Sequence, residues 1–153
     1  MTYKICEWDS TLGKQVERNA TPSEAAEFDA RKIPNIPVLK AAKNVEINLA
    51  RAAANQTTFP YLGKDIACDA LSRSDIDAIA NSIGLNDTFP VGFPMGWKCV
   101  DNTYIGIPDV ASFKNMYAAM VAEGTANFNK SQQLKAALAN ATTEVAIRSI
   151  VWS

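Results

Sequence analysis

The chain has no histidine, and this absence narrows the chemistry that its side chains can perform. Histidine is the commonest general base near neutral pH and the usual partner of a nucleophilic serine or cysteine. It is also a ligand in most catalytic zinc sites. The remaining route to hydrolysis is a pair of carboxylates, which can act as general acid and general base.

Two pairs of aspartates are close enough in sequence to be considered for such a role. Asp65 and Asp69 share one face of a short predicted strand, where both could approach one cation, but oxygen sites for calcium or magnesium usually have denser ligands. Asp75 and Asp77 are two residues apart on a predicted helix, so they point to different sides. Glycine-rich phosphate loops are absent. We therefore assign no catalytic residue, no metal site and no cofactor.

The three cysteines, Cys6, Cys68 and Cys99, are widely separated. This spacing fits neither a disulfide framework nor a zinc site, which would need clustered pairs. We expect them to be small, buried apolar side chains.

Trp97, Tyr104 and Phe113 form a candidate aromatic surface or core. Together they could bind a sugar or a base as a platform. Packing in the core is the preferred interpretation, because aromatic side chains supply much of the buried area in small cores.

These aromatic residues lie in a predicted hairpin that leads into a helix. Asp101-Asn102 is expected to be a two-residue turn, which would place Cys99 opposite Tyr104 and Trp97 opposite Gly106. Asp109 is the expected N-cap of a helix whose apolar positions recur every three or four residues, and the helical pattern continues from Ser131 to Ala141. The recurring positions are Val110, Phe113, Tyr117, Met120, Val121, Gly124 and Phe128.

The remaining elements have their own local signals. In the N-terminal part they are a strand over residues 3–8, a break from Asp9 to Gly13 with a possible return at 15–18, and a helix from the capping box Thr21–Glu24 to about Arg31. Further along they are a hairpin around Leu62–Lys64, a helix capped by Ser72 and ended by Gly84, and a last turn capped by Thr143. These patterns predict a mostly helical α+β fold. It has an N-terminal strand, turn and helix (1–37), a connecting helix (38–55), and a small C-terminal module in which two short hairpins pack with several helices (58–153).

The connecting helix carries a heptad pattern. The prolines in Ile33–Pro37 should prevent a helix before residue 38. After them, apolar residues recur at spacings of four and three, which is typical of a coiled-coil seam. Self-association through this seam and packing of one amphipathic helix on its own domain both remain open. The candidate seam consists of Val38, Ala42, Val45, Leu49 and Ala52.

Composition limits the partners that the chain can have. Of its 153 residues, 48% are hydrophobic and 20% charged, with a net charge of −1. Its 15 basic residues are scattered, so neither nucleic acid nor an anionic membrane is expected to bind. No apolar run is long enough to cross a bilayer, and the N-terminus lacks the apolar segment of a secretion signal. We expect the chain to be made and kept in a cytoplasm, or released by lysis.

A series of short motifs runs from about Ala50 to the C-terminus. It consists of an alanine-rich helix (Leu49 to Ala54), an aromatic-Gly-x-x-Ile-x-x-Asp strand (Tyr61, Gly63, Ile66, Asp69), the Ser72 helix, Trp97-x-x-x-Asp101-Asn102 with its returning strand, and a helix ending in Leu134-Lys135-Ala136-Ala137 followed by Ala141-Thr142. In this order the motifs resemble an uncharacterised C-terminal domain, domain of unknown function 4376, that recurs in tail-associated proteins of tailed bacteriophages and prophages. The N-terminal third is similar in style to leading segments of phage tail-fibre, tail-tip and fibre-assembly proteins.

The resemblance implies a context and no activity. The expected function is that of a non-enzymatic virion structural protein, a tail-fibre, tail-tip or baseplate subunit, made in the host cytoplasm and acting through contacts with other phage tail proteins. A homotrimer is favoured, since the heptad seam could serve a threefold fibre. The alternative is a tail-fibre assembly chaperone that is absent from the mature particle. A third hypothesis is a carbohydrate-binding or hydrolytic domain that uses Trp97 and Tyr104.

Overall fold

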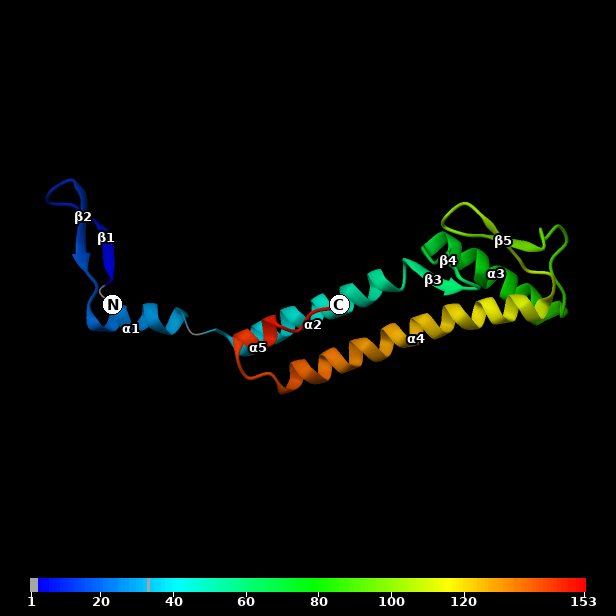
Figure 1. Ribbon diagram of the computed structural model, residues 1–153. Coiled ribbons are helices and arrows are strands. Elements are labelled where there is room, and N and C mark those ends of the chain that lie inside the picture. Colours follow the sequence, from blue (N-terminus) through cyan, green and yellow to red (C-terminus); the bar gives the residue numbers. More distant parts are fainter. Residues whose placement is uncertain (1–2, 33) are drawn as a thin grey trace. The chain divides into compact units, whose positions relative to one another are not determined.

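The computed structural model of the chain describes residues 3–32 and 34–153 (Figure 1). These residues form five helices and three two-stranded antiparallel sheets, which confirms the predicted mostly helical α+β fold. The chain divides into two compact units, residues 1–39 and 40–153.

The first unit begins with the hairpin of β1 (Lys4–Asp9) and β2 (Lys14–Asn19). In its turn the Asp9 carboxylate accepts hydrogen bonds from the N–H groups of Thr11 and Leu12, at 2.8 and 3.0 Å. Such a side-chain bond to backbone two or three residues ahead stabilises a turn locally. The predicted strand and its return are therefore both present.

Helix α1 (Pro22–Lys32) begins with the predicted capping box. The Thr21 N–H donates to the Glu24 carboxylate at 2.8 Å, and the Glu24 N–H donates to the Thr21 hydroxyl at 3.3 Å. The Arg18 guanidinium also donates to both Glu24 carboxylate oxygens at 2.7 Å. This guanidinium, together with the Thr21 N–H and hydroxyl, holds the pKa of Glu24 well below its usual range.

Helix α2 (Ile36–Ala54) begins two residues earlier than the proline pattern predicts. Asn35 caps it, since its side-chain oxygen accepts from the Val38 N–H at 3.2 Å. Pro37 lies in the first turn, where a helical N–H has no intrahelical partner and proline is tolerated. The expectation that residues 36 and 37 are non-helical was therefore wrong, and Ile33 lies outside the described residues.

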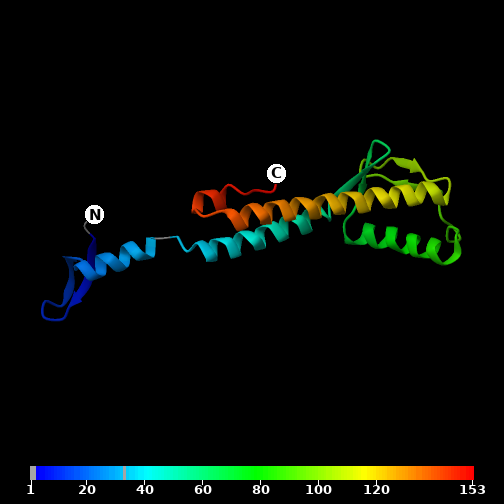
Figure 2. The ribbon, with the colours of Figure 1, turned by 90° about the horizontal axis from the view of Figure 1, so that it is seen from below.

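The second unit is built along its longest helix, α4 (Val110–Asn140). Helix α2, from Lys40 onward, lies beside the C-terminal half of α4, and α3 (Ala70–Asn86) lies beside the N-terminal half (Figures 1 and 2). The Lys40 amine donates to the Ala139 carbonyl at 2.7 Å near one end of this pairing. Helices α2 and α3 thus follow one another along a single supporting helix.

A hairpin of β3 (Thr58–Tyr61) and β4 (Lys64–Ala67) connects these two helices. Both turn residues, Leu62 and Gly63, have positive φ (48° and 74°), as a two-residue hairpin turn requires. This confirms the hairpin predicted around Leu62–Lys64.

Both predicted ends of α3 were wrong. Asp69, not Ser72, is the N-cap: its carboxylate accepts from the backbone N–H groups of Leu71 and Ser72, and the Ser72 hydroxyl donates to it at 2.7 Å. The C-terminal end lies at Asp87, which has φ 55°, and not at Gly84. Aspartate can adopt this left-handed conformation, so the helix does not need glycine there.

The third hairpin, β5 (Gly96–Lys98) and β6 (Tyr104–Gly106), has a register one residue away from the expected one. Trp97 pairs with Ile105, and not with Gly106. The Cys99 N–H donates to the Thr103 carbonyl at 2.8 Å, so the pairing continues beyond the strands and leaves a three-residue loop, 100–102. Asn102 has a positive φ of 62°, the conformation that follows a type I turn in such loops. A one-residue change of this kind alters every cross-strand pair.

The core of the second unit lies between α3, α4 and the two hairpins. On α3, Ile76 and Ile83 are buried and Ile79 and Ala80 are partly buried. On α4, Val121 and Phe128 of the predicted apolar face are exposed. A smaller buried group lies where α2, the end of α4 and α5 (Glu144–Arg148) meet, and Thr143 caps α5 as predicted. The largest fully buried side chains are Phe59, Ile66, Ile76, Ile107, Phe113, Met116, Met120 and Ile147.

Candidate functional site

The candidate seam is an exposed apolar stripe on α2. The side chains of Val38, Val45 and Leu49 are 60%, 55% and 65% exposed, and Ala42 and Ala52 are exposed as well. Valine and leucine contribute free energy when water is removed from them, so a stripe of this kind is suited to a partner surface.

The opposite side of α2 is buried inside the second unit. Ile47 lies between Val45 and Leu49 in sequence, about half a helical turn away from both, and it is only 3% exposed. It lines a small cavity of about 200 Å³ together with Ala50 and Trp152. One apolar face of α2 is therefore buried, and a second apolar face is exposed. Self-association through the free face stays a prediction.

The three candidate aromatic residues do not form one platform. Phe113 is 1% exposed and its ring lies 6.1 Å from that of Trp97, whereas Tyr104 is 69% exposed. In the observed register Trp97 pairs with Ile105 and Tyr104 pairs with Lys98, so the two aromatic side chains project from opposite faces of the hairpin. Both nevertheless border one open groove of about 700 Å³. Phe113 belongs to the core.

The aspartates considered for catalysis have separate positions. Asp69 caps α3, and the backbone carbonyl of Asp65 accepts from the Val100 N–H at 3.0 Å. Asp75 borders the groove beside Trp97, while Asp77 lines a different pocket. Within residues 3–32 and 34–153, no three histidine, cysteine, aspartate or glutamate side chains are grouped so that they could hold a metal ion.

The cysteines differ in burial. Cys68 and Cys99 are buried as expected, but Cys6 is exposed, because the two-stranded sheet that contains it leaves this face uncovered. Burial raises the pKa of the Cys68 thiol, and the nearby Arg73 guanidinium offsets part of this rise. Cys68 is therefore a neutral thiol at pH 7.

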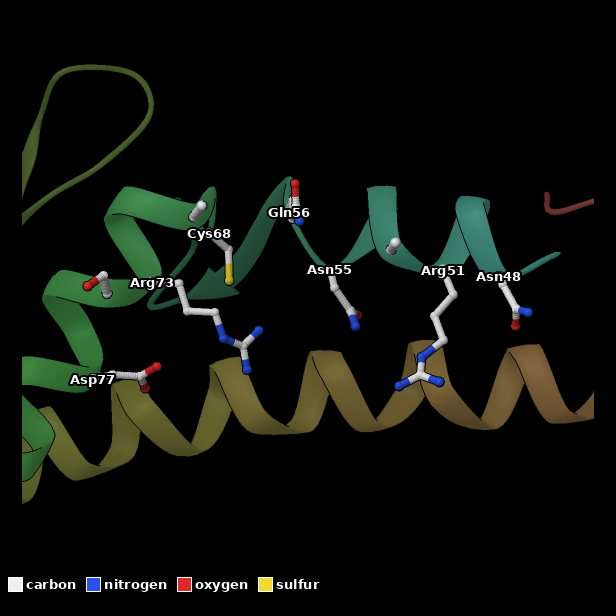
Figure 3. Close-up of a pocket in the computed structure, with 10 residues that line it drawn as sticks. Asn48, Arg51, Asn55, Gln56, Cys68, Arg73 and Asp77 are labelled. Atoms are coloured by element: carbon white, nitrogen blue, oxygen red, sulfur yellow. The ribbon is translucent and has the colours of Figure 1, made fainter. Parts of the chain in front are cut away.

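A polar pocket of about 760 Å³ lies where α2 ends and α3 begins (Figure 3). We did not predict it from the sequence. The sequence pattern that marks it is a pair of stripes at helical spacing i, i+3, i+4 and i+7, each with three polar side chains, one of them an arginine in second place, and one alanine. The stripes are Asn48, Arg51, Ala52 and Asn55 on and just after α2, and Ala70, Arg73, Ser74 and Asp77 on α3.

None of the described helices is both long and apolar enough to cross a membrane. The sequence matches a protein family over residues 38–151, and this family is described as a domain of unknown function (DUF4376). Neither a curated protein nor a solved structure matches the chain.

Proposed function

The chain belongs to the DUF4376 family, and we propose that it is a non-enzymatic structural subunit of a bacteriophage tail. The proposal is based on this membership, on the likeness of its motifs to phage tail proteins and on the free face of α2. The subunit is part of a tail fibre, tail tip or baseplate, and it acts through protein contacts. Its partners are other phage tail proteins and further copies of itself.

The observation that carries the proposal is the two-sided use of α2. One face, around Ile47, is buried within the unit, and the opposite face carries the heptad stripe. The spacing places Leu49 at an a position and the β-branched Val45 at a d position. Leucine at a with a β-branched residue at d favours assemblies of three or four helices over two. A trimer is the state we propose.

The expected association is weak. Burying two valines and one leucine contributes roughly 4–9 kcal/mol per chain. Association itself costs about 4–15 kcal/mol. Since the two quantities are comparable, the isolated chain should associate only at high concentration, and neighbouring tail proteins would supply the remaining contacts.

A double substitution in the stripe, Val45→Asp with Leu49→Asp, tests self-association. The wild type should show a concentration-dependent increase in mass by sedimentation equilibrium, and the variant should stay monomeric and folded. The matched control is Leu85→Asp with Val91→Asp, because these side chains are also exposed but lie outside α2. A wild type that is monomeric at the highest concentration would exclude this seam.

Quantitative mass spectrometry on purified particles of a tailed phage that encodes the chain tests the rest of the proposal. A fixed, small copy number relative to the tail-tube protein is the expected result, and a multiple of three would agree with the trimer. Absence from particles combined with abundance in the lysate would overturn it and favour the assembly chaperone.

A further inference from the structure

The polar pocket between α2 and α3 contains two partly buried arginines without a carboxylate partner. None of the ion pairs between described residues involves Arg51 or Arg73. In Figure 3 both side chains extend in the same direction from their helices. A partly buried guanidinium that lacks an anion is suited to receive one from a ligand, since charge-assisted hydrogen bonds to oxyanions are strong and directional.

The Arg51 side chain is held in place by an aromatic ring. Its guanidinium lies 4.9 Å from the centre of the Phe128 ring on α4. Stacking of this kind leaves the edge of the guanidinium, where its N–H donors are, available for hydrogen bonding. Less side-chain freedom is then lost when a ligand binds.

Arg73 lies beside Cys68, and the uncharged thiol does not neutralise the charge of the guanidinium. Burial raises the pKa of the Cys68 thiol, so this group stays uncharged near neutral pH. Asp77 is the one acidic residue that lines the pocket. The two arginines and this aspartate leave the pocket with a formal charge of +1, in a chain whose net charge is −1.

Side-chain amides supply the remaining polar groups of the pocket. The buried Asn127 donates to the Asn55 side-chain oxygen at 3.1 Å, which orients the Asn55 amide and leaves its N–H groups available. Asn48 and Gln56 add two further amides to the lining. Each of these groups can both donate and accept hydrogen bonds, as sugar hydroxyls do.

Taken together, these groups point to one class of ligand. The arginines suit an oxyanion, while the amides and the Asp77 carboxylate suit several hydroxyl groups. A volume of about 760 Å³ is within the range of small-molecule sites and accommodates one or two sugar rings. We propose that this pocket binds an anionic sugar, a uronic acid or a sugar phosphate, with Arg51 and Arg73 supplying the positive charge that attracts the anion.

Titration of the isotope-labelled chain with glucuronate and with glucose 6-phosphate, followed by NMR, tests this proposal. At least one of them should cause saturable shifts of the Asn48, Asn55 and Gln56 side-chain amide signals. Which of the two binds more tightly identifies the anion as carboxylate or phosphate. Glucose, which lacks the anion, and inorganic phosphate, which lacks the ring, should each bind at least about tenfold more weakly.

Substitution of the arginines tests whether the sugar binds in this pocket. Arg73→Gln should weaken binding about tenfold or more, because it removes a charge-assisted contact. Arg51→Lys keeps the charge but loses the planar donors, and it should weaken binding by a smaller factor. Arg148→Gln is the matched control, since Arg148 pairs with Glu144 on α5 outside the pocket. Unchanged thermal unfolding would show that the variants are folded.

Three results would overturn the proposal: no saturable shifts with either anionic sugar, equal affinity for glucose or inorganic phosphate, or equal loss of binding in Arg148→Gln. Ala52 belongs to both the seam and the pocket, so the titration should be repeated with the Val45→Asp, Leu49→Asp variant. A single chain lines the pocket, so this variant should bind the sugar as the wild type does. Loss of binding there would refute a site within one chain, independently of the proposed tail function.

Discussion

The two units of this chain are stabilised in different ways. Among the described side chains of residues 3–39 none is fully buried, whereas residues 40–153 enclose a core of apolar side chains from helices and hairpins. In the first unit, order comes from the backbone bonds of one hairpin, a capping box, the contacts of Arg18 with Glu7 and Glu24, and the contacts of Tyr3 with Phe28 and Asp29. Exposed ion pairs contribute little to stability, so the free energy of unfolding of this unit should be much smaller than that of the second.

The comparison bears on the proposed function. A short hairpin and helix without a core are marginal alone and gain stability when a neighbour covers their apolar side chains. Trp8 and Leu12 of this hairpin are 67% and 60% exposed. The first unit therefore has the properties of a segment that attaches to a partner protein, and the second those of an independently stable module.

The largest expected effect is the loss of the Phe113 side chain from the second unit. Its ring contacts those of Phe89, Phe93 and Trp97. Phe113→Ala should lower the free energy of unfolding by about 3–5 kcal/mol through lost burial and a residual cavity. Urea denaturation followed by NMR should show the loss in signals of residues 40–153. Equal loss in the signals of residues 4–30 would contradict the independence of the two units.

Thiol reactivity offers a second way to compare the units. Cys6 is exposed in the first unit, and Cys68 and Cys99 are buried in the second. With an alkylating reagent under native conditions, Cys6 should react fastest. The other two should react at least about a hundredfold more slowly, because their exposure requires opening of the core. Mass spectrometry of timed samples measures each rate, and similar rates for all three would show that the core opens readily.

Acid should unfold the first unit before the second. The Arg18 guanidinium and Thr21 hold the folded-state pKa of Glu24 well below its usual range, so the ionised carboxylate stabilises the folded state. This contribution is present above the unfolded pKa of about 4.3 and is lost as the pH falls below it. The pKa of Asp101 and Asp109 in the second unit is also lowered, but a core remains there when they are protonated.

The indole N–H signals of Trp8 and Trp97 report the two units separately in an acid titration. The Trp8 signal should lose its folded position at the higher pH. Glu24→Gln should reduce the pH dependence of the first unit, while Glu17→Gln, a change of an exposed residue on β2 of the same unit, should leave it unchanged. If Trp97 loses its native shift before Trp8 does, the assigned difference between the units is wrong.

Local signals in the sequence predicted most elements of both units, because their causes lie within a few residues. The Thr21–Glu24 box, the Leu62-Gly63 turn and the Asp109 cap each act over four residues or fewer. The error at the start of α3 arose where two adjacent caps compete: Asp69 and Ser72 both fit an N-cap, and the longer helix retains more backbone hydrogen bonds. The choice depends on where β4 ends.

The polar pocket could not be predicted from such local signals, because it forms only where the end of α2 and the start of α3 meet along α4. Arg51 and Arg73 are 22 residues apart, and each is an ordinary charged residue when its own helix is considered alone. The hairpin register failed for a different reason. Asn102 adopts a positive φ that asparagine permits but does not require, so the loop length was not determined by residue types alone.

The smallest expected effect is that of Tyr104→Ala, and it separates packing from ligand binding on the third hairpin. Tyr104 is 69% exposed and shares its face of the hairpin with Lys98, so its truncation should change the free energy of unfolding by less than about 0.5 kcal/mol. Trp97→Ala should cost considerably more, because that ring packs against Phe113. Urea titrations of both variants measure the difference. If instead Trp97→Ala leaves stability unchanged while abolishing binding of a neutral glycan, the groove beside Trp97 is a carbohydrate site, and this aromatic ring belongs to function and not to the core.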